Sequence, residues 1–180
     1  MRQALKLHPD SRCAAATHID VEAARPRPGN LLLHYFVTGK TGDLRRPPAA
    51  APARADELWR HTCFEAFVRA SGDAYYEFNF APSTQWAAYR FAGYRNAMRV
   101  ASEVGAPYFD VQSNDAGFEL QVALDLSNLP LDGPWRLGLS AVIEEASGRL
   151  SYWALTHPPG KPDFHHSDCF ALELPAPLRP

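Results

Sequence analysis

The chain has 180 residues, of which 46% are hydrophobic and 21% are charged, and its formal net charge is −2 at pH 7. This length suits one domain with a core of its own, and the composition is ordinary for a soluble globular protein. The small net charge, without a basic run among the aromatic residues, argues against nucleic acid as a partner.

The N-terminal stretch, residues 1–13, reads as a short alternating strand and lacks the apolar core of a signal peptide. No apolar run approaches the length of a membrane span, so we expect no membrane partner. Cys13, Cys63 and Cys169 are odd in number and widely spaced, which argues against a disulfide framework. We therefore expect a reduced, cytoplasmic protein.

Hydrophobic and polar residues alternate with a period of two along most of the chain, which is typical of half-buried strands. Eleven such segments are predicted as strands: residues 3–8, 17–23, 30–37, 63–68, 75–80, 85–91, 108–113, 117–124, 135–145, 150–155 and 169–174. Short helices are expected only at residues 55–59 and 96–104. The pattern predicts an all-β fold, either a barrel or, as we favour, an antiparallel two-sheet β-sandwich.

One segment breaks this pattern. Residues 40–57 are rich in proline, alanine and arginine and are predicted to form a flexible loop within the fold. The stretch before it is too short to form a separate core. We therefore expect a single domain over residues 1–180.

The alternation also assigns each strand two faces. One face is expected in the core between the sheets: Phe64, Ala66, Val68, Tyr76, Phe78, Phe80, Phe118, Leu120, Val122, Leu124, Phe170, Leu172 and Leu174. The opposite face mixes charged, amide and aromatic side chains and is expected to be an outer or concave surface: Cys63, Glu65, Phe67, Tyr75, Glu77, Asn79, Glu119, Gln121, Cys169 and Glu173.

Three stretches together resemble the DOMON-like domains and the related family 9 carbohydrate-binding modules. "LWRHTCFEAFV" places a Trp several residues before a Glu, and "YYEFNFAPSTQWAAY" is an aromatic strand with an Asn, followed by a turn and a Trp-bearing strand. "SYWALTHPPGKPDFHHSDCFALEL" is similar to the closing hairpin of these families. The resemblance covers residues 58–174.

The resemblance implies a jelly-roll-like β-sandwich that binds a sugar or, in some relatives, a haem. In sugar-binding relatives, aromatic rings stack on the sugar while Arg, Asn, Gln and Glu side chains bind its hydroxyls. The residues that match these roles are Trp59, Glu65, Glu77, Asn79, Trp86, Tyr89, Tyr94, Arg95 and Trp153.

The residues themselves leave alternatives open at several of these positions. Trp86 and Tyr89 lie three apart, so they face opposite sides of a strand and one of them is expected in the core. Tyr94 and Arg95 would either meet a ligand or form an ordinary ion pair at a strand end. Glu65 and Glu77 would be either an acid/base pair for glycoside hydrolysis or hydrogen-bonded carboxylates facing solvent.

The stretch "HPPGKPDFHHSDC" contains His157, His165 and His166 among other metal-ligand types. Adjacent histidines on an extended segment point to opposite sides, so structural hydrogen bonds are favoured over a metal site there. A haem would need an axial ligand such as Met98 or a histidine. We expect no cofactor, neither haem nor metal ion.

The strongest enzyme signatures, a Gly-rich phosphate loop, a Gly-x-Ser-x-Gly elbow and a Cys-x-x-Cys pair, are absent from the sequence. We therefore expect a non-catalytic module that binds a small molecule, with a carbohydrate as the favoured ligand. The alternatives are a glycoside-acting or metal-dependent hydrolase, and a module whose aromatic face meets a protein partner.

Overall fold

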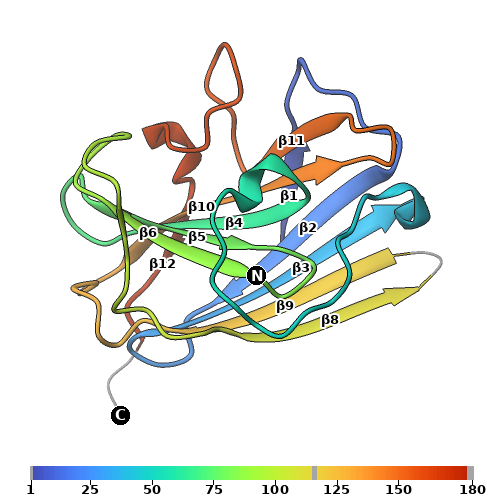
Figure 1. The fold of residues 1–180 in the computed structure, drawn as a ribbon. Helices are drawn as coiled ribbons and strands as arrows, with labels where there is room; N and C mark the ends of the chain where they lie inside the picture. The colour runs from blue at the N-terminus through green and yellow to red at the C-terminus, as the bar shows by residue number, and fades with distance from the viewer. Residues whose placement is uncertain (1, 115–116, 178–180) are drawn as a thin grey trace.

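The computed structural model describes residues 2–114 and 117–177, which form twelve strands and three short 3-10 helices (Figure 1). The strands are β1 (Arg2–Leu7), β2 (Ala16–Ala24), β3 (Asn30–Gly39), β4 (Cys63–Arg69), β5 (Tyr75–Phe80), β6 (Trp86–Phe91), β7 (Arg99–Val100), β8 (Tyr108–Asn114), β9 (Gly117–Asp125), β10 (Trp135–Glu144), β11 (Leu150–Ala154) and β12 (Leu172–Leu174). The 3-10 helices are η1 (Thr41–Asp43), η2 (Leu58–Arg60) and η3 (Ser167–Cys169). None of the helices in the described residues is long and apolar enough to cross a membrane.

All strands except β7 lie within or overlap the segments where hydrophobic alternation predicts them. Along β9, buried residues alternate with half-buried ones, so one face packs in the core while Glu119 and Gln121 point outward. The predicted helix at residues 96–104 is wrong, because Arg95 and Ala97 adopt positive φ angles of 50° and 49° and turn the chain into β7. The helix expected at residues 55–59 is reduced to η2, a single 3-10 turn.

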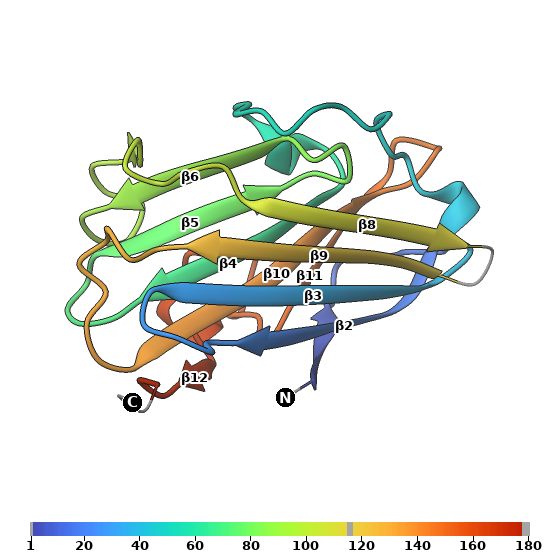
Figure 2. The ribbon, with the colours of Figure 1, turned by 90° about the horizontal axis from the view of Figure 1, so that it is seen from below.

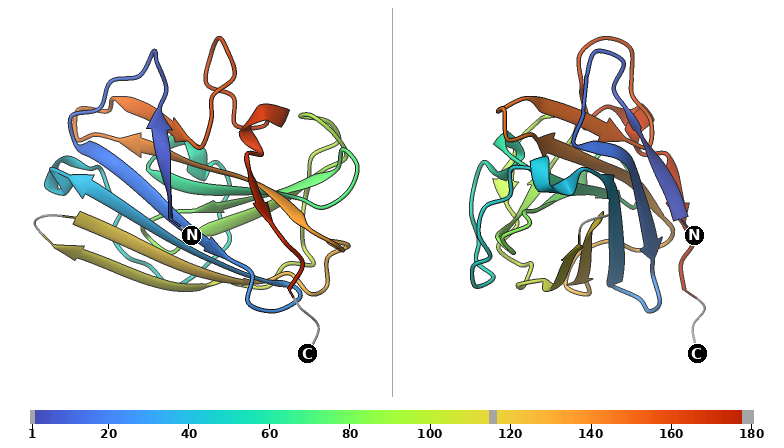
Figure 3. Two further views of the ribbon diagram at one scale, coloured as in Figure 1. Left: turned by 180° about the vertical axis from the view of Figure 1, so that it is seen from behind. Right: turned by 90° about the vertical axis from the view of Figure 1, so that its right-hand side faces the viewer.

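All neighbouring strands pair antiparallel in one continuous sheet, in the order β7-β6-β5-β4-β10-β11-β1-β2-β3-β9-β8, with β12 also paired to β10. β1 joins the two halves of this sheet, because its residues 2–5 pair with β2 and residues 6 and 7 pair with β11. The sheet curls so that the halves pack face to face (Figure 2, Figure 3). The predicted antiparallel all-β fold is confirmed, and the two predicted sheets are continuous through β1.

The core lies between the two halves of the curled sheet. Phe64 of β4 stacks on Phe118 of β9, with ring centroids 5.8 Å apart. The buried Tyr35 of β3 donates a hydrogen bond across the core to the backbone oxygen of Glu65, at 2.8 Å. The side chains predicted for the core on β4, β5 and β9 are buried there, which confirms their assignment.

The opposite face of β4, β5 and β6 is also buried, and here the prediction of solvent-facing carboxylates is wrong. Glu65, Glu77 and Asn79 are only 3%, 6% and 0% exposed. A second apolar cluster covers this face, with Leu58 contributed by η2 and Phe164 by the loop before η3. Strands β4 and β5 therefore lie between two packed layers of side chains.

The proline- and alanine-rich segment, residues 40–57, lies against β6. Trp86 donates a backbone hydrogen bond to Ala53 and accepts one from Ala55, each 3.0 Å long. The Arg54 guanidinium lies 4.1 Å from the Trp86 ring centroid. These contacts hold the segment that leads into η2. The flexibility predicted for the loop remains a prediction.

Candidate ligand-binding pocket

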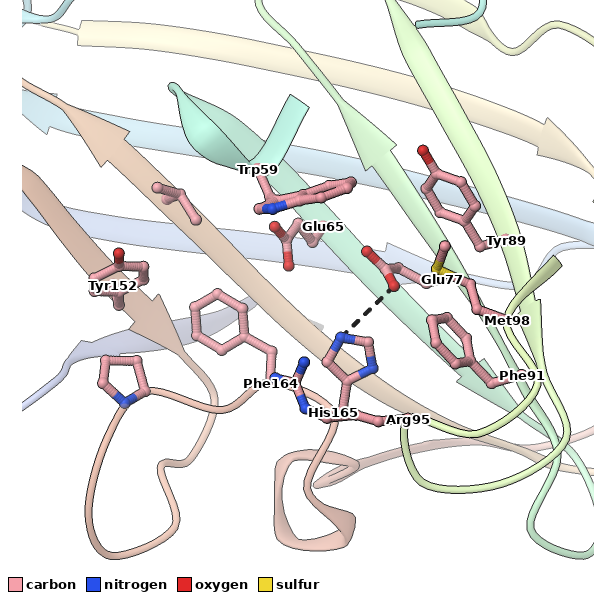
Figure 4. A pocket seen from close by; sticks show the side chains of 12 residues that line it. Trp59, Glu65, Glu77, Tyr89, Phe91, Arg95, Met98, Tyr152, Phe164 and His165 are labelled. Carbon is pink, nitrogen blue, oxygen red and sulfur yellow. Dashed lines mark ion pairs between the residues drawn. The ribbon is translucent and has the colours of Figure 1, made fainter. Parts of the chain in front are cut away.

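A pocket of about 390 Å³ opens on the face of β4, β5 and β6 that lies opposite the main core. It is walled by η2, by the turn between β6 and β7, and by the loop between β11 and η3 (Figure 4). The lining residues are Trp59, Glu65, Glu77, Tyr89, Phe91, Arg95, Met98, Val142, Tyr152, Pro162, Phe164 and His165.

Two carboxyl groups form the floor of the pocket. In the pairing of β4 with β5, Glu65 lies opposite Asn79 and Phe67 lies opposite Glu77, so the two glutamates are diagonal neighbours on one face. Ser140 Oγ donates to Glu65 Oε2 at 3.4 Å, and Asn79 Nδ2 donates to Glu77 Oε1 at 2.8 Å. The strand register thus brings both acids to one place.

Burial raises the pKa of both carboxyl groups, because the charged form loses its hydration. The pKa of Glu65 is held well above its ordinary value by burial and by the nearby charge of Glu77. Burial raises the pKa of Glu77 to about 7, although the Asn79 hydrogen bond and the charge of Arg95 act in the opposite direction. Near neutral pH the floor therefore offers both an O–H donor and carboxylate acceptors.

His165 closes one side of the floor. Its Nε2 lies 3.7 Å from Glu77 Oε2, and its Nδ1 lies 2.8 Å from the Tyr75 hydroxyl. That hydroxyl already accepts the backbone N–H of Arg95 at 3.2 Å, so it is placed to donate to Nδ1 and leave the imidazole proton on Nε2, facing Glu77. Burial lowers the pKa of His165 to about 4, so the ring is neutral near pH 7.

Arg95 is bound to the opposite loop rather than to the floor. Its Nη2 donates to Asp163 Oδ1 at 2.9 Å, and the same oxygen accepts the backbone N–H of His165 at 3.1 Å. The other Asp163 oxygen accepts the Tyr94 hydroxyl. This group of contacts ties the β6–β7 turn to the loop before η3 across the rim of the pocket.

Aromatic rings form the walls above the carboxyl groups (Figure 4). Trp59, carried by η2, is 39% exposed, and its ring meets that of Tyr89 edge-on with centroids 6.3 Å apart. The Tyr89 hydroxyl donates to Asp56 Oδ1 at 2.6 Å, so the segment before η2 fixes the ring. Phe91 and Phe164 line the same space. The pocket thus combines ring faces with a polar floor.

Six of the residues predicted for a site line this pocket: Trp59, Glu65, Glu77, Tyr89, Arg95 and His165. Asn79 lies beneath it and holds Glu77. The structure corrects the prediction that Trp86 and Trp153 contact a ligand. Their side chains are only 3% and 4% exposed and lie in the main core. As expected from their spacing, Trp86 and Tyr89 face opposite sides of β6, and it is Trp86 that faces the core.

The other predicted residues lie elsewhere. Tyr94 is exposed outside this pocket and is bound to Asp163. His157 contacts the backbone oxygen of Lys6 at 2.8 Å, and the His166 ring accepts the backbone N–H of Asp168 at 3.3 Å. In the described part of the chain, no group of three or more His, Cys, Asp or Glu residues is arranged to hold a metal ion.

Sequence reasoning missed several lining residues, namely Phe91, Val142, Tyr152, Pro162 and Phe164, and it placed Met98 in a helix. Alternation does place Phe91 on the same side of its strand as Tyr89. Phe164 lies in a proline-rich loop, where no periodicity indicates which way a side chain points. Its position depends on a long-range contact that the local sequence does not encode.

No family model matches the chain, and no curated protein matches it. Among solved structures, the chain is similar to a proposed carbohydrate-binding protein of Bacteroides uniformis, with a TM-score of 0.64 and 18% identity over 93% of this chain and 83% of that one. It is also similar to a family 9 carbohydrate-binding module of Caldicellulosiruptor kristjanssonii in complex with cellotriose, with a TM-score of 0.59 and 13% identity over 100% and 84% of the two chains. A structure of such a module from the same organism with glucose gives 0.50 and 13% over 98% and 86%. At these identities the likeness establishes the fold.

Proposed function

We propose that the protein is a non-catalytic carbohydrate-binding module and that the pocket over β4, β5 and β6 is its sugar site. The observation that carries this proposal is the combination in one pocket of ring faces with a buried, hydrogen-bonding floor. Sugars have apolar C–H faces and hydroxyl edges, so they need both kinds of contact at once.

In this proposal Trp59 provides the main stacking surface, because it is the half-exposed ring of the pocket. Glu65 and Glu77 bind hydroxyl groups from below, as donor and acceptor according to which of them holds the proton. Tyr89 and His165 complete the polar edge. The volume of about 390 Å³ is within the range of small-molecule sites.

The comparisons support the proposal through the fold. The similar structures include modules described in complex with cellotriose and glucose, and they cover nearly the whole of this chain. We infer from the same likeness, and from the sequence resemblance, that the curled sheet is a jelly-roll-like sandwich of the DOMON-like type. We propose a sugar as the ligand in preference to a protein partner.

A glycan array followed by titration calorimetry tests the function. The screen has to reach millimolar ligand, so that it detects binding free energies as weak as about −4 kcal/mol. Trp59→Ala is expected to weaken binding about tenfold, since it removes the stacking surface. Tyr108→Ala is the matched control, because that ring is 68% exposed on the edge strand β8, outside the pocket. Equal affinity of Trp59→Ala and Tyr108→Ala would show that the sugar does not bind in this pocket.

The floor also motivates the hydrolase alternative, since two carboxyl groups with raised pKa lie on neighbouring strands. A glycosidase, however, needs its two carboxyl groups on either side of the scissile bond, whereas Glu65 and Glu77 share one floor. Incubation with 4-nitrophenyl glycosides is expected to release no nitrophenol. Release that disappears in Glu65→Gln would establish the enzyme instead.

A further inference from the structure

The pocket floor holds two acids without a cationic partner. Glu65 and Glu77 are each more than nine-tenths buried, and their side-chain contacts are the Ser140 hydroxyl, the Asn79 amide and the imidazole of His165. Within residues 2–114 and 117–177, neither carboxylate forms an ion pair with a Lys or Arg side chain. A buried carboxylate without a cation is costly, and the cost is relieved by a proton or by a cation from outside.

The other titratable groups around the floor do not supply that cation. Cys63 of β4 and Tyr89 of β6 carry no positive charge in any state. His165 is neutral near pH 7, as described above. Arg95 is the permanently charged residue among the lining side chains, and its guanidinium is bound to Asp163. Its charge favours the ionised carboxylates, but less than the hydrogen bonds from Ser140 and Asn79 do.

The walls of the pocket suit a cation as well. The rings of Trp59, Tyr89, Phe91 and Phe164 line the space above the carboxyl groups (Figure 4). Ring faces carry a negative electrostatic potential and attract ammonium groups, most strongly at tryptophan. Carboxylates below and aromatic rings around are thus the surroundings that a protonated amine needs.

We propose that the sugar bound in this pocket is an amino sugar, with its protonated amine between Glu65 and Glu77 and its hydroxyls on the remaining polar groups. This inference rests on the proposed carbohydrate-binding function and specifies its ligand class. An ammonium group brings three N–H donors and the positive charge that the floor lacks. A neutral sugar brings only hydroxyls, so the acids keep their protons and no charge pair forms with the ligand.

Binding of an amino sugar is expected to change the protonation of Glu77. When an ammonium group binds, Glu77 is held in its charged form, so the complex releases a proton to solvent at any pH where the free protein holds it. Affinity for an amino sugar is therefore expected to increase as the pH rises from about 5 towards 7, as long as the amine of the sugar stays protonated. Affinity for a neutral sugar has no such cause to rise.

Titration calorimetry with D-glucosamine, D-glucose and N-acetyl-D-glucosamine tests the inference on the wild-type protein. Glucosamine is expected to bind about tenfold tighter than the other two, which lack the charge. Titrations in two buffers of different ionisation enthalpy are expected to show proton release for glucosamine and none for glucose. Cyclohexylammonium, a cation with a similar ring and no hydroxyls, is expected to bind more weakly than glucosamine.

Matched variants assign the effect to the floor. Glu65→Gln and Glu77→Gln keep the side-chain shape and remove the charge, and each is expected to abolish the preference for glucosamine. Glu119→Gln is the control, because that carboxylate lies on β9 outside the pocket and pairs with His34 at 2.8 Å. It is expected to leave the preference unchanged.

The contrary outcomes show whether the amino-sugar inference fails alone or together with the carbohydrate function. Equal affinity for glucosamine, glucose and N-acetylglucosamine, or array hits among neutral sugars alone, would overturn the amino-sugar inference and leave the carbohydrate function standing. Cyclohexylammonium that binds as tightly as glucosamine would show a site for amines in general, and would overturn both. No binding of any sugar at about 10 mM would also overturn both.

Discussion

Glu77 and His165 face each other in the pocket with opposite changes in proton affinity. The folded protein holds a proton on Glu77 up to about pH 7, whereas the carboxyl has an ordinary pKa of 4.5. The contribution of Glu77 to stability is therefore fully present below about pH 4.5 and is lost as the pH rises to about 7. His165, with its pKa lowered from 6.5 to about 4, contributes stability above about pH 6.5 that is lost as the pH falls towards 4.

These two contributions oppose each other between about pH 4.5 and 6.5, and variants are expected to separate them. In Glu77→Gln the free energy of unfolding should rise with pH from about 4 to 6.5, because His165 remains. In His165→Gln it should fall with pH from about 4.5 to 7, because Glu77 remains. Each trend amounts to at most about 3 kcal/mol, the free energy that corresponds to these changes in pKa. Urea unfolding at several pH values measures both.

Glu65 is present in both variants, and burial raises its pKa in both, so it adds a fall of stability with pH to each profile. This addition is smaller in Glu77→Gln, where the charge of Glu77 is absent, so the profile of Glu77→Gln is expected to rise relative to that of His165→Gln. Parallel pH profiles of Glu77→Gln and His165→Gln would contradict the assignment of the two groups. Such a result would mean that the pair shares its proton in a way that neither variant isolates.

The two faces of β5 are expected to respond differently to substitution. Phe78 is fully buried in the main core, so Phe78→Ala should lower the free energy of unfolding by about 3–5 kcal/mol. Glu77→Gln, measured near pH 5 where the acid is protonated, should change it by about 1 kcal/mol or less, because the amide has the shape of the neutral acid and still accepts from Asn79. Chemical denaturation of both proteins provides the comparison.

For single residues of the pocket, the sequence predicts the face of the strand on which they lie but not their burial. Alternation correctly assigns Glu65 and Glu77 to the face opposite the core, and it leaves open which of Trp86 and Tyr89 faces the core. It gives no sign that this face is covered, because the covering residues, Leu58 and Phe164, are distant in sequence from β5 and lie outside any strand. The sequence therefore predicted exposed carboxylates where the fold has buried ones, and their raised pKa values follow from that difference.

At the level of elements, Arg54 secures the segment that carries η2. Besides stacking on Trp86, its Nη2 donates to the backbone oxygens of Ala101 and Val104 at 2.9 and 2.6 Å. The guanidinium thus connects residues 40–57 to β6 and to the chain after β7. Since η2 follows this segment, the position of Trp59 at the pocket depends on it.

Arg54→Ala is expected to lower the free energy of unfolding by about 1–2 kcal/mol, through loss of the stacking contact and of two hydrogen bonds. It should also weaken ligand binding, because the segment that positions Trp59 is loosened. Arg60→Ala, which removes an exposed ion pair with Glu57, is the matched control and should change stability by about 0.5 kcal/mol or less. Equal effects of the two would show that Arg54 has no structural role.

Elements with regular periodicity were predictable, and irregular ones were not. The eleven alternating segments all contain strands. β7 was not predicted, since two residues at Arg99–Val100 are too few to show a period. The positive φ angles of Arg95 and Ala97 add to this difficulty, because neither residue type signals a left-handed turn as glycine or asparagine does.

For the molecule as a whole, we expect a colourless protein without a stoichiometric transition metal. His157, His165 and His166 have separate partners, and Met98 is 58% exposed at the pocket. An absorption spectrum and elemental analysis of the purified protein measure this. A Soret band would favour a haem protein, and one zinc per chain that is lost in His165→Ala would establish a metal site.

The joining of the two halves through β1 was not predictable, because strand pairing is non-local and alternation gives no partners. Residues 2–7 read as an ordinary strand in the sequence. In the structure they extend along β2 and then along β11, and so link the half that carries the pocket to the half that carries β3, β9 and β8. The N-terminal strand, only 6 residues long, thus connects the two halves of the sheet.

Deleting residues 1–7 is expected to destabilise the protein more than the loss of its core side chain alone. Leu5 is 3% exposed in the main core, and Leu5→Ala by itself should cost about 2–5 kcal/mol while the strand still pairs. The deletion removes the same side chain and also opens the edges of β2 and β11, which invites association between chains. Calorimetry with light scattering should show one cooperative transition for the full chain and for Leu5→Ala. The deleted chain should unfold in separate steps or aggregate. A deletion that costs no more than Leu5→Ala, and leaves a single transition, would mean that the two halves are held together by the core alone.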